Sequence, residues 1–77
     1  MSRLPIIDSK KFEKVLFTLG FVFVRQKGSH AYYKHPDGRY TTPPHHPGRD
    51  LGRSLIHKIL REINVTPEDF ILLLEKR

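Results

Sequence analysis

The most restrictive feature of this chain is a run of short β-forming segments in the middle of only 77 residues. Residues 21 to 24, 30 to 35 and 39 to 42 are rich in aromatic and β-branched side chains, which favour strands. Gln26-Lys27-Gly28-Ser29 and Pro36-Asp37-Gly38 lie between these segments and have the composition of turns. Strands joined by such short connections run antiparallel, so we expect a three-stranded meander.

Helices are predicted on both sides of this meander. Asp8-Ser9 is a helix-start signal and Gly20 is a suitable stop, and the residues between them form one apolar stripe at helical spacing. The first helix should therefore span about residues 9 to 19. A second stripe predicts a helix that begins between residues 51 and 55 and ends near Asn64. Thr66-Pro67, followed by two acids, predicts the start of a third helix.

The predicted order is α-β-β-β-α-α, which indicates an α+β two-layer sandwich. Helices at both ends of a meander should pack together on one face of the three-stranded antiparallel sheet. We expect one domain over residues 1–77, because a second would have no core of its own. Residues 43 to 50 contain three prolines and a glycine and are predicted to be a loop. The layout is close to the double-stranded-RNA-binding arrangement.

The charge is positive and unevenly distributed. The formal net charge is +6. Residues 10 to 61 carry eleven Lys and Arg residues against three acids, a net charge of +8, and residues 62 to 77 carry −2. A polyanion would therefore meet the first three-quarters of the chain. Charge alone does not distinguish RNA from DNA or from an acidic protein.

Several kinds of site are unexpected in this sequence. There are no cysteines, which excludes disulfides, a thiolate nucleophile and cysteine-ligated zinc. Zinc needs three or four converging ligands, and the adjacent His45 and His46 are a poor start, so we expect no metal and no cofactor. No stretch approaches the length of a membrane span. The N-terminus lacks the long apolar region of a signal peptide, so we expect a cytoplasmic protein.

The segment from Arg25 to His30 is the most informative for chemistry. Gly28 permits a tight turn and the close approach of a phosphate. Ser29 can donate a hydrogen bond to a phosphate oxygen, and Arg25 and Lys27 add positive charge. A histidine side chain, with an ordinary pKa of about 6.5, can both take and give a proton near neutral pH. RNA cleavage needs such proton transfers together with charge stabilisation at phosphorus.

An ordered set of motifs resembles the HicA (YcfA-like) family of mRNA-interferase toxins. The set covers about residues 8 to 74. It comprises Leu19-Gly20-Phe21, Lys27-Gly28-Ser29-His30 with Tyr32 and Tyr33, His35-Pro36-Asp37-Gly38-Arg39, Pro43-Pro44-His45, and Ile59-Leu60-Arg61-Glu62-Ile63-Asn64-Val65-Thr66 with Phe70. The sequence departs from the family pattern at His46 and Pro47. It also has Asn64 where glycine is common, although asparagine tolerates the same backbone conformation.

The resemblance implies a fold, an activity and a partner. The fold is a double-stranded-RNA-binding-like sandwich. The activity is ribonuclease cleavage of mRNA without a required metal, with His30 as the catalytic residue. The usual partner is a HicB-type antitoxin that covers this histidine and the basic surface around it.

Further residues are candidates for supporting roles. His45 is a candidate for the second proton-transfer group, because one histidine can perform only one transfer at a time. Tyr32 and Tyr33 must point to opposite faces of their strand, so one should be core and the other could stack on a base. The residues expected to contact RNA are Lys10, Lys14, Arg25, Lys27, Gly28, Ser29, Lys34, Arg49 and Arg53.

Two other functions are compatible with the same surface. The first is an RNA-binding module, like a double-stranded-RNA-binding domain, that does not cleave. Binding alone does not need a histidine after Gly28-Ser29, which favours the enzyme. The second is a DNA-binding module, which is disfavoured because no predicted helix combines a basic face with residues for reading bases.

Overall fold

The computed structural model describes residues 4–45 and 48–75, and its elements follow the predicted order with two small strands added. Residues 46 and 47, where the sequence departs from the family pattern, lie outside this part. The elements are β1 (Ile7–Asp8), α1 (Ser9–Leu19), β2 (Val22–Lys27), β3 (His30–Lys34), β4 (Tyr40–Thr41), β5 (Asp50–Leu51), α2 (Arg53–Glu62) and α3 (Pro67–Glu75).

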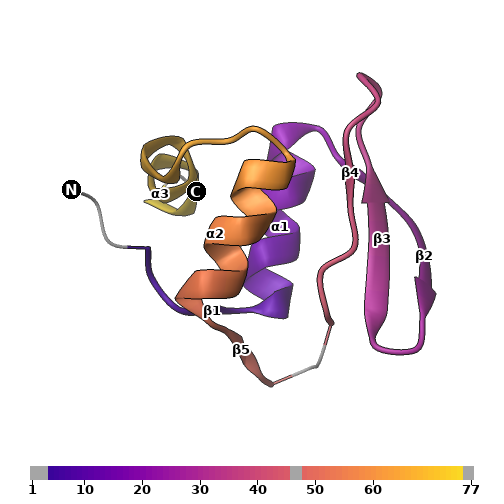
Figure 1. Ribbon diagram of the computed structural model, residues 1–77, viewed down its shortest axis with the longest axis horizontal. Coiled ribbons are helices and arrows are strands. Elements are labelled where there is room, and N and C mark those ends of the chain that lie inside the picture. The colour runs from indigo at the N-terminus through magenta and orange to yellow at the C-terminus, as the bar shows by residue number, and fades with distance from the viewer. Residues whose placement is uncertain (1–3, 46–47, 76–77) are drawn as a thin grey trace.

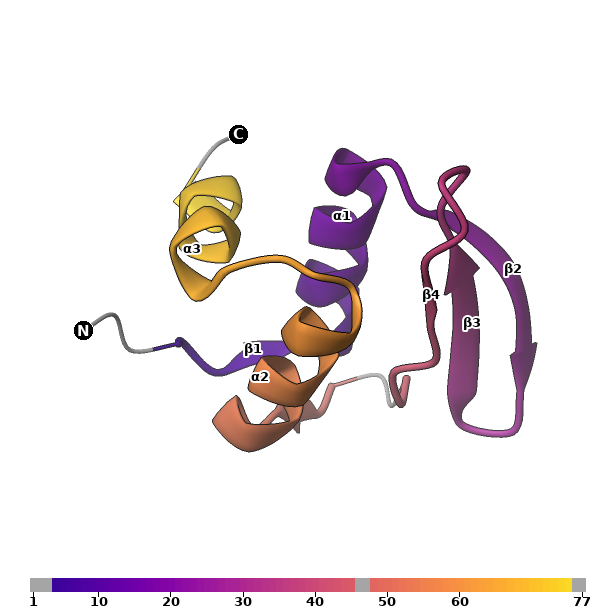
Figure 2. The same ribbon diagram turned by 45° about the horizontal axis from the view of Figure 1, so that its top comes forward.

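The main sheet has the strand order β2-β3-β4, and both pairs are antiparallel. All three helices lie on one side of it, as Figures 1 and 2 show. The α+β architecture and the meander were thus predicted correctly from the spacing of turns and apolar residues. One face of the sheet packs on helices, and we refer to the opposite face as the outer face.

The core forms where the apolar stripes of the helices meet the inner face of the sheet. Helix α1 begins at the predicted residue, because the Asp8 side chain accepts a hydrogen bond from the Lys11 amide at 2.8 Å. It ends at Gly20, which takes a left-handed conformation with φ of 105°. The buried apolar residues are Leu4, Ile7, Phe12, Val15, Leu16, Phe21, Ala31, Tyr33, Leu51, Ile56, Ile59, Leu60, Ile63 and Phe70.

The end of α2 and the start of α3 also follow the sequence. Asn64 has φ of 59°, which confirms that asparagine can serve where a left-handed residue is needed. The Thr66 hydroxyl accepts a hydrogen bond from the Asp69 amide at 3.1 Å. Thr66 therefore caps α3, and Pro67 is its first residue, as predicted.

The prediction that residues 43 to 50 form only a loop is wrong at two points. Pro44 forms an isolated β-bridge with His30, so the chain continues along β3 after β4 has ended. At the other end, Asp50 belongs to β5, which pairs with β1 through Ile7 opposite Leu51. Strands of two residues are too short to show an alternating pattern, so this pairing is visible only once the helices are packed.

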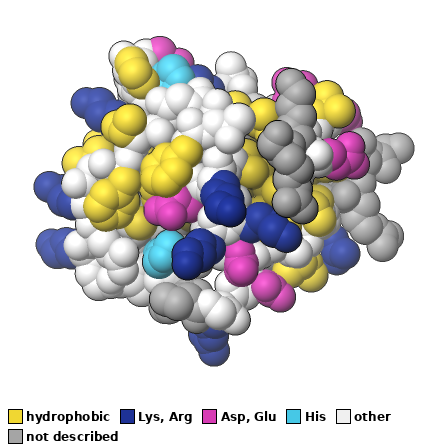
Figure 3. All heavy atoms as spheres, turned by 180° about the vertical axis from the view of Figure 1, so that it is seen from behind, with side chains coloured by type: hydrophobic (Ala, Val, Ile, Leu, Met, Phe, Trp, Pro, Cys, Tyr) yellow, Lys and Arg dark blue, Asp and Glu magenta, His cyan; other side chains and the backbone are white. Residues whose placement is uncertain are grey.

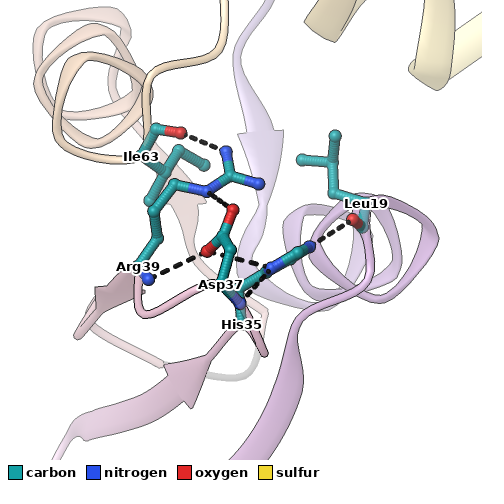
Figure 4. A network of polar contacts seen from close by, with 5 residues as sticks. All are labelled: Leu19, His35, Asp37, Arg39 and Ile63. Carbon is teal, nitrogen blue, oxygen red and sulfur yellow. Dashed lines mark hydrogen bonds and ion pairs between the residues drawn. The ribbon is translucent and has the colours of Figure 1, made fainter.

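A polar network fixes the β3–β4 hairpin to the ends of two helices (Figure 4). His35 Nε2 donates to the Leu19 carbonyl at 3.2 Å, and its Nδ1 accepts from the Asp37 amide at 3.1 Å. Arg39 donates to the Asp37 carboxylate at 2.8 Å and to the Ile63 carbonyl at 2.5 Å. The hairpin thus satisfies carbonyls at the C-termini of α1 and α2 and holds the sheet at a fixed position on the helices.

Candidate nucleic-acid interface

His30 is the first residue of β3 and is exposed on the outer face of the sheet. Alternation along β3 buries Ala31 and Tyr33, each 1% exposed, against the helices. His30, Tyr32 and Lys34 consequently point the other way, since successive side chains of a strand alternate between faces. The imidazole therefore stands on a paired strand of the sheet, with solvent in front of it.

A β-bulge in β2 determines which of its side chains share this face with His30. Phe23 pairs with Tyr33, but Arg25 pairs with Tyr32, so Val24 is an extra residue. Without the bulge, the register would place Arg25 opposite Ala31, on the core side. The extra residue reverses the alternation.

The bulge brings positive charge onto the outer face. Arg25 lies opposite Tyr32, and Lys27 lies opposite His30. Directly opposite residues of an antiparallel pair have Cβ atoms about 4.5–5.5 Å apart. The catalytic candidate therefore has a lysine as its immediate cross-strand neighbour.

Three side chains next to His30 on this face contact one another, and we refer to Arg25, Tyr32 and Tyr40 as the stack, in which the two tyrosine rings meet edge to face. The Arg25 guanidinium carbon lies 5.6 Å from the centre of the Tyr32 ring. On the other side, the Tyr32 and Tyr40 rings lie 5.8 Å apart at an angle of 76°. Tyr32 is half-buried between these partners, whereas Tyr40 is 61% exposed. Of the two tyrosines in β3, Tyr33 is thus the core residue and Tyr32 faces outward.

Tyr40 was not among the residues predicted to form the site. A signal for it was present, because the Pro36-Asp37-Gly38 turn places Tyr40 directly opposite Lys34. Tyr40 then lies diagonally across from Tyr32, within reach of an aromatic side chain.

The turn between β2 and β3 is held in place beside His30. Gly28 has φ of 59°, and a Cβ there would have no heavy atom within 4 Å. The Gln26 side-chain amide donates to the Gly28 carbonyl at 3.1 Å, and the Ser29 carbonyl accepts from the His45 amide at 2.5 Å. The open space above Gly28 leaves the approach to its backbone free of side chains.

His45 is close to this turn through its backbone but belongs to the other side of the sheet. Pro44 is paired with His30 and shares its face, so the next residue alternates to the helix side. His45 there lines a small crevice with residues of α1 and the core, among them Ser9, Glu13 and Tyr33. The register therefore does not place the two imidazoles on one face.

Within that crevice, Tyr33 and Glu13 form a partly buried pair. The Tyr33 hydroxyl donates to the Glu13 carboxylate at 2.5 Å. Burial, and then the bond to this carboxylate, raises the pKa of the Tyr33 phenol above its ordinary value. The pair lies on the helix side, away from the outer face, and links α1 to β3.

The other predicted RNA contacts are spread over different surfaces. Lys10 and Lys14 are exposed on α1, on the helix side of the sheet. Arg49 is exposed before β5. Arg53 is exposed at the start of α2, and its Nε donates to the Leu4 carbonyl at 2.6 Å, which holds the N-terminal segment.

Figure 3 shows Lys and Arg side chains at several places on one face of the molecule. In this view from behind, Lys and Arg side chains gather near the centre, close to Asp and Glu side chains. Others project from the left margin, which is the side on which the sheet lies. Basic side chains are therefore not confined to the side of the molecule on which the sheet lies.

The described part of the chain contains neither a candidate metal-binding cluster nor a candidate membrane-spanning helix. Among residues 4–45 and 48–75, no three His, Cys, Asp or Glu side chains are grouped so that they could hold a metal ion. In the same residues, no helix has the length and apolar character needed to cross a membrane.

A family model matches most of the chain. The family model described as "HicA toxin of bacterial toxin-antitoxin" matches residues 9–65, from the first residue of α1 to just before α3. This span contains the main sheet, the outer face and His30. No curated protein matches the chain.

Proposed function

Because the chain belongs to the HicA toxin family, we propose that it is an endoribonuclease that cleaves mRNA without a required metal and uses His30 as its catalytic residue. The observation that carries this proposal is the position of His30. It is exposed on a paired strand, opposite Lys27 and next to the Gly28-Ser29 turn. These are the groups that a phosphodiester needs around it for proton transfer and charge stabilisation.

The proposed reaction is an intramolecular transfer within the RNA strand. His30 takes the proton of a ribose 2′-hydroxyl, and the resulting oxygen attacks the adjacent phosphorus. The bond from phosphorus to the 5′-oxygen breaks, which leaves a 2′,3′-cyclic phosphate and, after protonation of the leaving oxygen, a 5′-hydroxyl. Lys27 and the Gly28-Ser29 turn stabilise the negative charge that develops on the phosphate oxygens.

Two other roles for His30 lead to different products or a different pH dependence. As a base acting on water, it would give a linear phosphate end. As the acid for the leaving oxygen, it would have to be protonated before the reaction. Identification of the phosphate end by mass spectrometry distinguishes the attack by water from the attack by the 2′-hydroxyl.

A second group must give a proton to the leaving oxygen if His30 acts as the base. The His45 amide donates to the Ser29 carbonyl, next to His30, but His45 lines the crevice that contains Glu13 and Tyr33. We therefore expect His45→Gln to slow cleavage much less than His30→Ala does. The leaving oxygen would then take its proton from water or from Lys27.

The toxin–antitoxin family implies an antitoxin partner for this chain. We propose that the partner is a HicB-type antitoxin that covers His30 and the basic outer face, in the cytoplasm where mRNA is found. An antitoxin that covers this face would block access of RNA to the histidine. Added antitoxin should therefore inhibit cleavage by wild type and still bind His30→Ala.

The experiment that tests the function compares wild type, His30→Ala and His57→Ala after expression in a bacterial host. His57 is an exposed histidine on α2 and serves as the matched control. Wild type and His57→Ala should stop growth and degrade bulk mRNA, and His30→Ala should do neither at the same protein level. Removal of a general acid or base typically costs 10²–10⁴-fold in rate, which purified proteins should show on a labelled RNA.

The main competing function is RNA binding without cleavage, favoured by the exposed Lys10 and Lys14 on α1. Such a protein would bind RNA with equal affinity as wild type and His30→Ala, and neither would degrade mRNA. This outcome would leave the fold and the family in place but overturn the proposed enzymatic activity.

A further inference from the structure

The three strands of the main sheet carry no acidic side chain. Their residues include Arg25, Lys27 and Lys34, all exposed, and no Asp or Glu. The same strands contribute the stack of Arg25, Tyr32 and Tyr40. Strands that carry cations, the exposed Tyr40 ring and no acids present a surface complementary to a polyanion that carries flat bases.

We propose that this outer face binds single-stranded RNA, with an unpaired base stacked on Tyr40 and another phosphate of the same short stretch next to Lys27 and His30. The inference rests on the proposed function only for the role of His30 in cleavage. The binding surface itself is argued from the stack, the bulge and the charge of the strands.

The geometry of the stack suits a base that binds from outside. Tyr32 is fixed between the Arg25 guanidinium on one side and the Tyr40 ring on the other. Tyr40 meets Tyr32 edge to face and is 61% exposed, which leaves much of its side chain open to a further flat group. Stacking on a ring that is already oriented costs little conformational entropy, because few rotamers remain to be fixed.

The β-bulge in β2 is a second observation that favours a functional role for the stack. Without Val24 as an extra residue, Arg25 would face the core and Lys27 would no longer lie opposite His30. The bulge therefore assembles both the cation at the base of the stack and the cation next to the histidine. Bulges commonly redirect side chains at functional sites in this way.

The arrangement favours a single strand over a duplex. In an A-form helix the bases are stacked on each other, and aromatic side chains reach only bases that are splayed out. Tyr40 lies opposite Lys34, and Lys34 and His30 are four residues apart on one face of β3, about 13 Å along the strand. A base at the stack and the phosphate at His30 can thus belong to the same short stretch of RNA.

The alternative is that the stack only stabilises the sheet, because aromatic and cationic cross-strand pairs have that effect. A stabilising role and an RNA-binding role predict different results for substitutions of Tyr40. A structural role predicts a loss of stability with unchanged RNA affinity. The proposed role predicts a loss of affinity in a protein that still folds, and its rescue by any residue that retains the ring.

The test uses His30→Ala as the background, so that RNA is not cleaved while binding is measured. The probe is a short fluorescein-labelled single-stranded RNA, and its anisotropy is followed at fixed salt for Tyr40→Leu and Tyr40→Phe. The control is Phe17→Leu, which removes a ring that is 47% exposed on α1. Circular dichroism and thermal unfolding check that each variant is folded.

We expect Tyr40→Leu to weaken binding about 5- to 150-fold, since base–aromatic stacking contributes that much to affinity. Tyr40→Phe should bind nearly as wild type, Phe17→Leu should be unchanged, and a duplex of the same sequence should bind more weakly than the single strand. If Tyr40→Leu is folded and binds as tightly as its parent, or if the duplex binds better, the inference is wrong.

Failure of this inference and failure of the proposed function are distinguishable. If wild type does not cleave but its binding depends on Tyr40, the stacking surface stands and the enzyme does not. If wild type cleaves and Tyr40→Leu cleaves and binds equally well, the enzyme stands and the stacking surface does not.

Discussion

Tyr33 connects the core of the protein to α1 through a single polar contact. Its ring is 1% exposed, and its hydroxyl bonds to Glu13. Tyr33→Phe keeps the ring but removes the donor and leaves the partly buried carboxylate of Glu13 without it. We expect a loss of about 1.5 kcal/mol in the free energy of unfolding, measured by urea denaturation at pH 7.

The same residue predicts how stability changes at alkaline pH. The pKa of the Tyr33 phenol is raised in the folded state, first by burial and then by Glu13. Its contribution is fully present below the ordinary tyrosine pKa of about 10 and is lost as the pH rises above that value. The melting temperature of wild type should therefore fall above pH 10, and that of Tyr33→Phe should fall less steeply. Equal slopes would contradict this assignment.

Asp37 has the opposite pH dependence. The hydrogen bond from the Arg39 amide, followed by other contacts, lowers the pKa of its carboxyl group. The stability that this contributes is present above the ordinary pKa of about 3.9 and is lost as the pH falls through the lower, folded-state value. Asp37→Asn should flatten the fall in melting temperature below about pH 4.

Arg39→Lys is the matched control for Asp37. It keeps the backbone donor, which is the largest cause of the lowered pKa, and removes only the guanidinium contacts. Its melting temperature should retain most of the acid dependence of wild type. If Arg39→Lys flattens the curve as much as Asp37→Asn does, the side chain rather than the backbone amide controls the carboxylate.

At the scale of elements, two glycines with nearly the same backbone conformation allow a comparison. Gly20 and Gly38 have φ of 105° and 103°. A Cβ at Gly20 would lie 2.8 Å from His35 Nε2, whereas a Cβ at Gly38 would have no heavy atom within 4 Å. His35 cannot move away freely, since it bonds to Leu19 and packs on Phe21.

We therefore expect Gly38→Ala to cost about 1–2 kcal/mol from backbone strain alone. Gly20→Ala should cost about 1 kcal/mol more, because it also displaces the bond from His35 to α1. That difference corresponds to roughly 4–8 °C in melting temperature for a domain of this size. In a His35→Ala background the extra cost should disappear, and if it persists His35 is not its cause.

The elements themselves could be predicted from sequence where local signals agree. Asp8, Gly20, Thr66 and Pro67 mark helix ends by their own backbone and hydrogen-bonding preferences, so the bounds of α1 and the start of α3 were predicted correctly. The Pro36-Asp37-Gly38 turn fixed the second hairpin in the same way. Each of these signals acts over a few neighbouring residues.

The parts that could not be predicted depend on contacts between distant residues. Across the bulge at Val24, Phe23 pairs with and packs on Tyr33 while Arg25 pairs with Tyr32. Simple alternation along β2 therefore predicts the wrong face for every side chain after Val24. The pairing of Ile7 with Leu51 likewise forms only when α1 and α2 are in place. His30 could be identified as a candidate from its motif, but its cross-strand neighbour Lys27 and the stack with Tyr40 depend on the register.

On the scale of the whole molecule, two groups of three cations are alternative binding surfaces for RNA. Arg25, Lys27 and Lys34 lie on the strands, and Lys10, Lys11 and Lys14 lie on α1. Replacing either group with glutamine removes the same number of charges and so lowers the net charge equally. Any difference between the two triple variants must then come from the position of the charges.

The salt dependence of binding can separate these groups. For single strands, each phosphate contact contributes about −0.7 to the slope of log K against log salt concentration. The strand triple variant should therefore flatten this slope by about 2, while the α1 triple variant should stay close to wild type. A larger effect from the α1 triple would place RNA along the helix instead of on the outer face. Equal effects would mean that net charge attracts RNA without a defined surface, because only a localised contact can make two variants of identical charge differ.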